Sequence, residues 1–154
     1  MKNKFKIYII ILYCLFLISK SVNANEPFVF DITEIEVLKQ GNQINGYNGG
    51  KVTSKDGSII TAQKFFYNKL TNILEMSGNV KYFDKVKNIV ITSDKAIYLK
   101  NKEKIFTTGN SKVVNNQNTI KASNLEYDKF KNTFEAKKDA VAIDFEKDTT
   151  IFAD

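Results

Sequence analysis

The sequence predicts an all-β fold, an open-edged curled sheet built from about three repeats of roughly 30 residues. Beyond residue 25, apolar and polar residues alternate over short runs that are rich in β-branched and aromatic types, which is typical of strands. Polar clusters interrupt these runs about every 15 residues. The same spaced skeleton of apolar residues occurs three times along the chain, which indicates a stack of similar units.

The N-terminal residues 1–24 are expected to form a secretory signal peptide that precedes the folded domain. They begin with a lysine-rich segment, continue with an apolar run of about 12 residues and place small residues, Val22 and Ala24, at the −3 and −1 positions of a cleavage site after Ala24. The run is shorter than the roughly 20 residues that span a bilayer, and an uncleaved membrane anchor is the alternative interpretation. The sequence therefore predicts an exported domain over residues 25–154.

The residue inventory excludes several kinds of chemistry. The chain contains no histidine, and its single cysteine, Cys14, lies in the predicted signal peptide. Disulfides and Ser-His-Asp or Cys-His nucleophilic sites are therefore excluded from residues 25–154, and a zinc site is not expected. The sequence has no phosphate-binding glycine loop and no carboxylate pair in an apolar context. We expect a protein that is not an enzyme and that needs no metal or cofactor.

The charge pattern argues against a nucleic-acid partner. Four of the 23 basic residues lie in the predicted signal peptide and all 17 acidic residues lie beyond it, which leaves a net charge of +2 for the domain. Every basic residue is lysine, and the lysines are interleaved with Asp, Glu and Asn. Nucleic-acid binders concentrate positive charge on one face and favour arginine for phosphate contacts. The pattern predicts a solvated outer face instead.

Each repeat has an isoleucine, a small residue, an apolar residue and a position that is always tyrosine. The three sets are Ile60, Ala62, Phe65 and Tyr67; Ile91, Ser93, Ala96 and Tyr98; and Ile120, Ala122, Leu125 and Tyr127. A large apolar residue follows each tyrosine by seven positions, at Leu74, Ile105 and Phe134. Ile151 opens a fourth copy, so the predicted open strand edge comprises Ile151, Phe152 and Ala153.

The spacing within a unit predicts a kink. Ile60 and Ala62 point to one face of a strand, whereas Phe65 and Tyr67 have the opposite parity. All four face one core only if an extra residue is inserted, as in a β-bulge, which also bends the strand. The alternative is a flat sheet with aromatic residues on both sides, which would leave a large apolar area in water. We expect kinks at residues 63–64, 94–95 and 123–124.

The predicted interior is rich in large apolar side chains for a thin protein. A plain hydrophobic core explains them, and an apolar groove that accepts hydrocarbon is the functional alternative. The predicted groove lining comprises Ile60, Ala62, Phe65, Tyr67, Leu74, Met76, Val80, Ile91, Ala96, Tyr98, Ile105, Leu125 and Phe134.

Three stretches carry a family resemblance. They are "FVFDITEIEV" with a glycine-rich turn after it, "GSIITAQKFFYNKLTNILEMSGNVKYF" and "ITSDKAIYLKNKEKIFTTGNSKV". Together they resemble the OstA-like (organic solvent tolerance) family, which comprises the lipopolysaccharide-transport protein LptA and the N-terminal periplasmic domain of LptD. Gly78-Asn79-Val80 and Gly109-Asn110 match the family's Gly-Asn-Val element. The third unit departs from it, because Lys138-Asp139-Ala140 contains no glycine.

The resemblance implies an antiparallel, taco-like β-jellyroll in the periplasm of a Gram-negative cell. It implies an apolar groove that carries the lipid A acyl chains of lipopolysaccharide, and β-strand addition to other OstA-like domains in a bridge to the outer membrane. Familiar members have more repeat units, so a truncated LptD-type domain is the alternative to an LptA-like bridge. Two further hypotheses are an assembly module that binds no lipid and a small periplasmic enzyme acting on envelope glycans.

Overall fold

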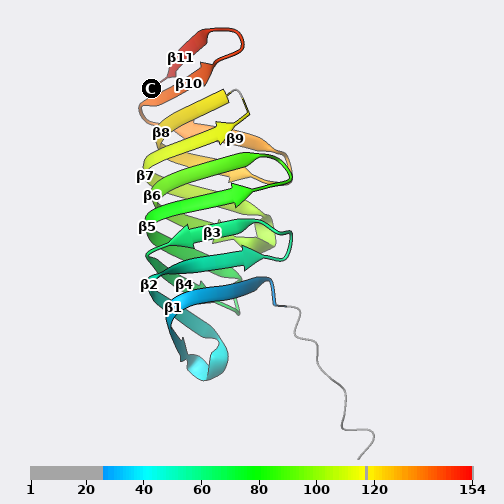
Figure 1. Ribbon diagram of the computed structural model, residues 1–154, viewed down its shortest axis with the longest axis vertical. Helices are drawn as coiled ribbons and strands as arrows, with labels where there is room; N and C mark the ends of the chain where they lie inside the picture. The colour runs from blue at the N-terminus through cyan, green and yellow to red at the C-terminus, as the bar shows by residue number, and fades with distance from the viewer. Residues whose placement is uncertain (1–25, 117, 154) are drawn as a thin grey trace, which may run out of the picture.

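The computed structural model describes residues 26–116 and 118–153, which form one antiparallel sheet of 11 strands (Figure 1). The all-β prediction is confirmed, whereas the predicted signal peptide lies outside the described residues. The strands are β1 (Phe28–Leu38), β2 (Gln43–Ser54), β3 (Ile59–Ala62), β4 (Lys64–Asn68), β5 (Ile73–Asp84), β6 (Ile89–Leu99), β7 (Lys104–Asn115), β8 (Asn118–Asp128), β9 (Thr133–Lys137), β10 (Ala140–Asp144) and β11 (Thr149–Ala153). Two 3₁₀ turns are η1 (Lys39–Gly41) and η2 (Lys100–Lys102).

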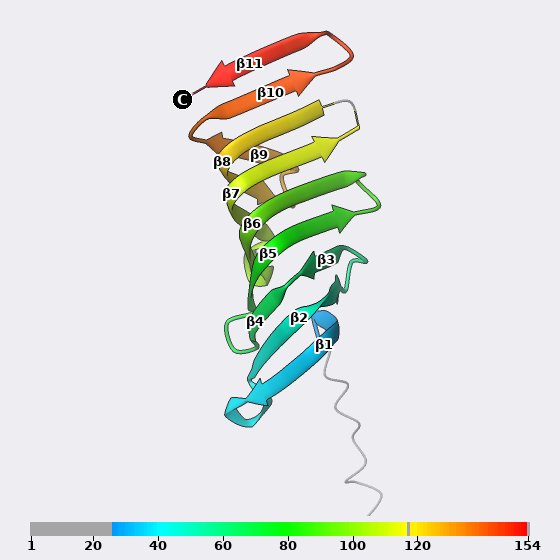
Figure 2. The same ribbon diagram turned by 60° about the vertical axis from the view of Figure 1, so that its left-hand side comes forward.

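Neighbouring strands follow one another along the chain, because each is joined to the next by a tight turn. The spatial order is β1-β2-β3-β5-β6-β7-β8-β10-β11, with β4 between β2 and β5 and with β9 beside β8. Figure 2 shows the strands stacked along the long axis, with β1 and β11 at opposite ends. β3 with β4, and β9 with β10, each act as one strand that is interrupted at a bend.

The predicted kinks are present, and each is one side of a corner in which two strands bend together. Between Ser77 and Val80, β5 has two residues where the paired β6 has one, Asp94. The two-residue side adopts left-handed backbone angles at every corner: Asn48-Gly49, Gly78-Asn79, Gly109-Asn110 and Lys138-Asp139. The extra residues increase local twist and fold the sheet back on itself. The corners divide the fold into two sides, and the long strands run through both. We call one side the β3 half, which also contains β10 and β11, and the other the β4 half, which also contains β9.

One corner was not expected from the sequence, and another forms without glycine. The expected turn after the first strand is η1, which contains Gly41, whereas Gly46, Gly49 and Gly50 lie within β2, where Asn48-Gly49 forms a fourth corner. The third unit forms its corner without glycine, since Lys138 and Asp139 have φ values of 64° and 54°. A backbone hydrogen bond of 2.9 Å from Ser123 N–H to the Lys138 carbonyl holds that corner, so the surrounding ladder imposes the left-handed angles.

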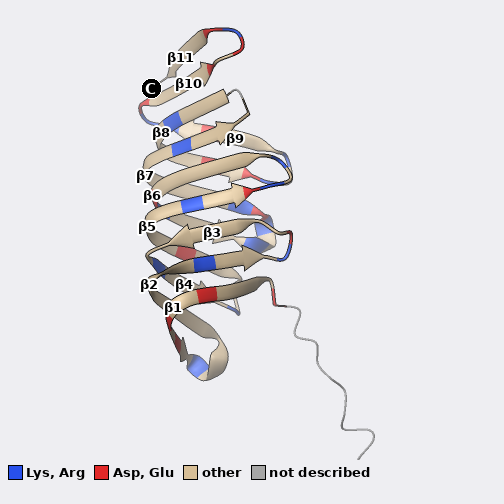
Figure 3. Ribbon diagram, viewed as in Figure 1, with Lys and Arg blue, Asp and Glu red and all other residues tan. Residues whose placement is uncertain are grey.

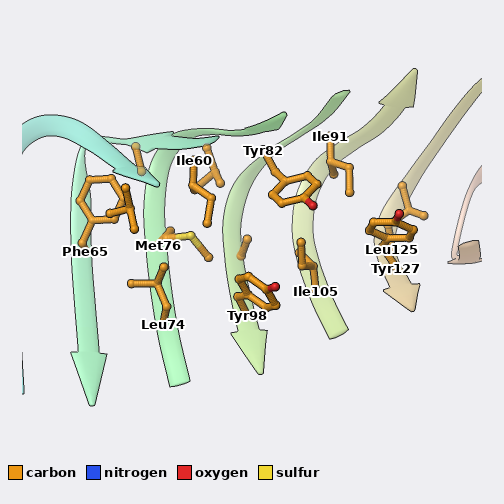
Figure 4. Packing of buried hydrophobic residues seen from close by; sticks show 14 of the residues in the cluster. Ile60, Phe65, Leu74, Met76, Tyr82, Ile91, Tyr98, Ile105, Leu125 and Tyr127 are labelled. Atoms are coloured by element: carbon orange, nitrogen blue, oxygen red, sulfur yellow. The ribbon is translucent and has the colours of Figure 1, made fainter. Parts of the chain in front are cut away.

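The corners place both ends of each long strand in one core (Figure 4). Ile60, Ala62, Phe65 and Tyr67 are all buried, as the parity argument predicts. In the second and third repeats the equivalent residues are likewise buried, except Ile120, which is half-buried against the same core. The flat-sheet alternative is therefore wrong.

The corner at Gly78 generates the first testable prediction. Gly78 has φ 79°, and a Cβ at this position would lie 2.8 Å from Gln63 Cβ. Gly57 has a similar φ of 85°, but a Cβ there would meet nothing within 4 Å. Gly57→Ala should lower the free energy of unfolding by about 1 kcal/mol, because alanine strains the left-handed backbone. Gly78→Ala should lower it by about 3 kcal/mol, because the new methyl group also overpacks against Gln63. Urea unfolding of both variants measures the difference, and equal costs would contradict the role of the corner.

Candidate functional site

The interior of the curled sheet is the candidate site, and it is closed along its middle. A cavity of only about 10 Å³ remains between Ile60, Met76, Ile91 and Ile105. This is about the least space that holds one water molecule, so the side chains fill the interior themselves. The structure brings all of the predicted lining residues to this interior. All are buried except Phe134, which is half-buried and stacks on Tyr127 with 4.5 Å between ring centres.

Sequence reasoning missed part of the lining. Val52, Tyr82, Ile89 and Val113 are almost fully buried in the same core. A parity signal was available, because Tyr82 follows Val80 by two residues and Ile89 precedes Ile91 by two. The repeat skeleton did not include these positions, since they lie near the strand ends, outside the spacing that the three repeats share.

The interior widens at the end of the sheet near β11. A hollow of about 450 Å³ lies there between the β3 half and Phe134 of β9. Its apolar wall follows one row of paired residues across four strands: Val113, Ile120, Ala142 and Ile151. Ile151, one of the predicted edge residues, is 61% exposed in this row, and Phe152 is exposed on the same strand.

The strand ends of the two halves meet along one line opposite the corners, which we call the seam. Turns of both halves line it, and charged residues gather at these turns (Figure 3). Aromatic side chains cross beneath it: the ring of Phe28 in the β3 half lies 5.2 Å from that of Tyr67 and 5.6 Å from that of Tyr98 in the β4 half. The seam is thus the side on which the two halves are held together by side chains rather than by backbone.

A buried lysine joins the two halves across the seam. Lys129 of the β4 half forms an ion pair with Asp56, which lies in the turn between β2 and β3. Its amino group also lies 3.1 Å from Glu103 Oε2 and donates a hydrogen bond of 2.9 Å to the Tyr98 hydroxyl, both within its own half. In the opposite direction, Lys87 of the β3 half donates to the Lys129 carbonyl at 2.7 Å and to the Tyr127 hydroxyl at 3.2 Å.

The network fixes the protonation states of its members. Burial alone would raise the pKa of Asp56, but hydrogen bonding to Lys129 and its charge lower that pKa far below the usual value. Burial likewise disfavours the Glu103 carboxylate, and Lys100, Tyr98 and Lys129 outweigh it, so the pKa of Glu103 is lowered. Burial alone would lower the pKa of Lys129, yet Asp56 and Tyr98 raise it. Asp56, Glu103 and Lys129 are therefore all charged at neutral pH.

A comparison among the repeats shows where this network departs from the common pattern. Tyr67 and Tyr127 each donate a hydroxyl hydrogen bond to an asparagine five residues later, at 2.8 Å to Asn72 and 3.1 Å to Asn132. In the middle unit, Tyr98 donates instead to Glu103, which has the same left-handed backbone as the two asparagines. Neutral asparagine satisfies the tyrosine in the other two units, so the charge of Glu103 is matched to its two lysine partners, Lys100 and Lys129.

The described residues offer no other chemical centre of the kinds considered above. Within residues 26–116 and 118–153, no group of three or more carboxylates, histidines or cysteines is placed to hold a metal ion. The same residues include no helix that is long and apolar enough to cross a membrane.

The ion pair at Asp56 predicts a pH dependence of stability. A carboxyl group whose pKa is lower in the folded than in the unfolded protein stabilises the fold above its unfolded pKa, about 3.9 for aspartate, and loses that contribution as the pH falls. Asp56→Asn should therefore cost about 1 kcal/mol at pH 7, because the carboxylate is partly exposed. The difference in free energy of unfolding between Asp56→Asn and the wild type should become smaller as the pH falls from 5 to 2. Urea unfolding across this range tests it. Asp31→Asn, at an exposed ion pair on β1, is the control, and a constant gap for Asp56→Asn would contradict the prediction.

Comparison with known proteins places this geometry in a family. Among curated proteins, no sequence matches the chain. The fold is similar to the crystal structure of LptH from Pseudomonas aeruginosa, described as the LptA-homologous periplasmic component of the conserved lipopolysaccharide transport device. The TM-score is 0.66 at 14% identity, over 73% of this chain and 83% of LptH. A family model described as OstA-like protein matches residues 29–149. This family agrees with the expectation of a non-catalytic protein, and the chain belongs to the OstA-like protein family.

Proposed function

We propose that the chain is a non-catalytic periplasmic module that binds lipopolysaccharide and carries its lipid A acyl chains toward the outer membrane. The observation that carries this proposal is the single apolar interior that runs through the curled sheet and widens to a hollow of about 450 Å³ near β11. The likeness to LptH, a periplasmic component of a lipopolysaccharide transport device, supports the proposal.

The closed interior sets a condition on how an acyl chain binds. Burial of hydrocarbon contributes about 0.8 kcal/mol per methylene group, which is ample to hold one acyl chain. Because side chains fill the middle of the interior, the acyl chain either enters at the wide end near β11 or enters where the two halves separate along the seam. The seam is the side that can open, since backbone hydrogen bonds join the halves only through the bent strands.

Partner binding in this proposal uses the edges of the sheet. In the described part of the chain, β1 and β11 each pair on one side only, which leaves backbone donors and acceptors for another strand. Ile151, Phe152 and Ala153 of β11 are exposed, and we propose that this strand adds to another OstA-like domain.

A second candidate function is assembly without lipid transport, in which the chain is an edge-to-edge module or part of an LptD-type outer-membrane assembly protein. The unpaired edges of β1 and β11 favour it, together with exposed apolar residues on both, such as Val29 on β1 and Phe152 on β11. Binding of lipopolysaccharide in the interior separates the two candidates.

Two adjacent phenylalanines provide a matched test of lipid binding. Phe65 is 3% exposed and faces the interior, whereas Phe66 lies on the outer face of the same strand. With the photo-crosslinker benzoylphenylalanine at either position, position 65 should label lipopolysaccharide at least tenfold more than position 66. Equal labelling, or labelling from position 66 alone, would contradict transport through the interior.

The proposed edge predicts the behaviour of a charged variant. Phe152→Lys places a charge on β11, and charges on edge strands oppose strand addition. The variant should reduce concentration-dependent association by about tenfold in light scattering, with Phe145→Lys in the exposed turn before β11 as the control. If Phe152→Lys associates as strongly as the wild type, the contact between molecules lies on a surface other than β11.

A further inference from the structure

A hollow of about 400 Å³ lies on the outer side of the seam, directly over the buried lysine network. It is lined from the β3 half by Asp56, Asp84, Val86 and Lys87, and from the β4 half by Lys100, Glu103, Lys129 and Phe130. We call it the seam hollow. Val86 is 88% exposed and Phe130 is 77% exposed, so two large apolar side chains flank a group of ammonium groups. This combination suits a ligand that carries both hydrocarbon and negative charge.

Three lysines and three carboxylates line the seam hollow, but they do not all pair with one another. Lys100 and Lys129 share Glu103 within the β4 half, and Lys129 also pairs with Asp56 across the seam. Lys87 has two neutral acceptors, the Tyr127 hydroxyl and the Lys129 carbonyl, and no carboxylate within ion-pair distance in the described part of the chain. An anion in the hollow therefore meets one ammonium group that lacks a charged partner. Asp84 is buried nearby and accepts the backbone N–H of Lys87 at 3.0 Å.

Asp56 is the member of the network that is easiest to exchange. Its side chain is 41% exposed, whereas those of Lys129 and Glu103 are 6% and 16% exposed. Asp56 can therefore return to water at small cost, while Lys129 keeps its contacts with Glu103 and Tyr98. A phosphate group offers more acceptor oxygens than a carboxylate and forms strong charge-assisted hydrogen bonds with lysine. The exchange also removes the ion pair that joins the two halves at this point.

We propose that the seam hollow binds a phosphate group carried by an amphiphile, and that this phosphate replaces Asp56 on Lys129 and releases the seam. The inference rests on the proposed function, because it gives the head group a place beside the interior that takes the acyl chains. It goes further by assigning Lys87, Lys100 and Lys129 to the anion and by making Asp56 its competitor.

The test uses a tryptophan reporter in the full chain, which contains no tryptophan of its own. Phe130→Trp keeps an aromatic side chain at the hollow, and its fluorescence follows binding of dihexanoyl phosphatidic acid, dihexanoylglycerol or sodium phosphate. We expect phosphatidic acid to bind at least tenfold more tightly than dihexanoylglycerol, which has the same tails and no phosphate, and more tightly than sodium phosphate. Lys87→Met should reduce this preference at least fivefold, whereas Lys102→Met, an exposed lysine of η2 outside the hollow, should leave it within twofold.

The variant Asp56→Asn separates competition from a merely structural role. Removal of the competing carboxylate should raise the affinity for phosphatidic acid about fivefold, although the same change weakens the fold. Asp31→Asn should leave this affinity unchanged. Lys129→Met should abolish the preference for phosphatidic acid. If Lys129→Met does not fold, the result for Lys87→Met tests the inference instead.

The possible results distinguish a site for a lipid phosphate from other kinds of binding at the seam hollow. Equal binding of the two lipids, or lower affinity in Asp56→Asn, would overturn the inference and leave the proposed function intact if the lipids still bind. Sodium phosphate binding as tightly as phosphatidic acid would overturn it by assigning the hollow to soluble anions. Binding of no probe would overturn the inference alone, because the proposed function is tested separately by the crosslinker at position 65.

Discussion

Each pair of strands must bend for both of its halves to face one interior, and this constraint shapes the rest of the protein. Side chains alternate between the faces of a straight strand, so Ala62 and Phe65, which have opposite parity, are both buried only because the strand bends between them. The paired strand absorbs the bend with two left-handed residues, as at Gly78-Asn79. Because the bend recurs at the same level in each repeat, the curled sheet encloses one continuous core rather than separate clusters.

The seam follows from the same geometry. When the long strands bend at their middles, their tight turns gather on the side opposite the corners. Charged residues are frequent in these turns, so charges that are distant in sequence become neighbours there. Asp56 and Lys129 are 73 residues apart and form an ion pair across the seam. Closure of the interior therefore depends on side-chain contacts, which separate more readily than a β-ladder.

Much of the fold could be predicted from the chain because the repeat skeleton records the parity change directly. The isoleucine, small residue, apolar residue and tyrosine of three units identified the bends and most of the core. The fourth corner at Asn48-Gly49 was not recognised, because β1 and β2 lack the spaced tyrosine skeleton. The third corner was predicted at residues 123–124, but its left-handed residues Lys138 and Asp139 were not, since their angles come from the neighbouring ladder rather than from glycine.

The sequence by itself determined the all-β class, the repeated bend, the apolar interior and the absence of histidine and cysteine chemistry from the domain. These are local or periodic properties, and parity and spacing record them. The tertiary structure alone decided that the interior is closed and that Asp56, Glu103 and Lys129 form a network. In the sequence these residues resemble the other solvated Asp, Glu and Lys of polar turns. Only the curl of the sheet brings their turns together and buries the lysine, because burial depends on contacts between distant segments.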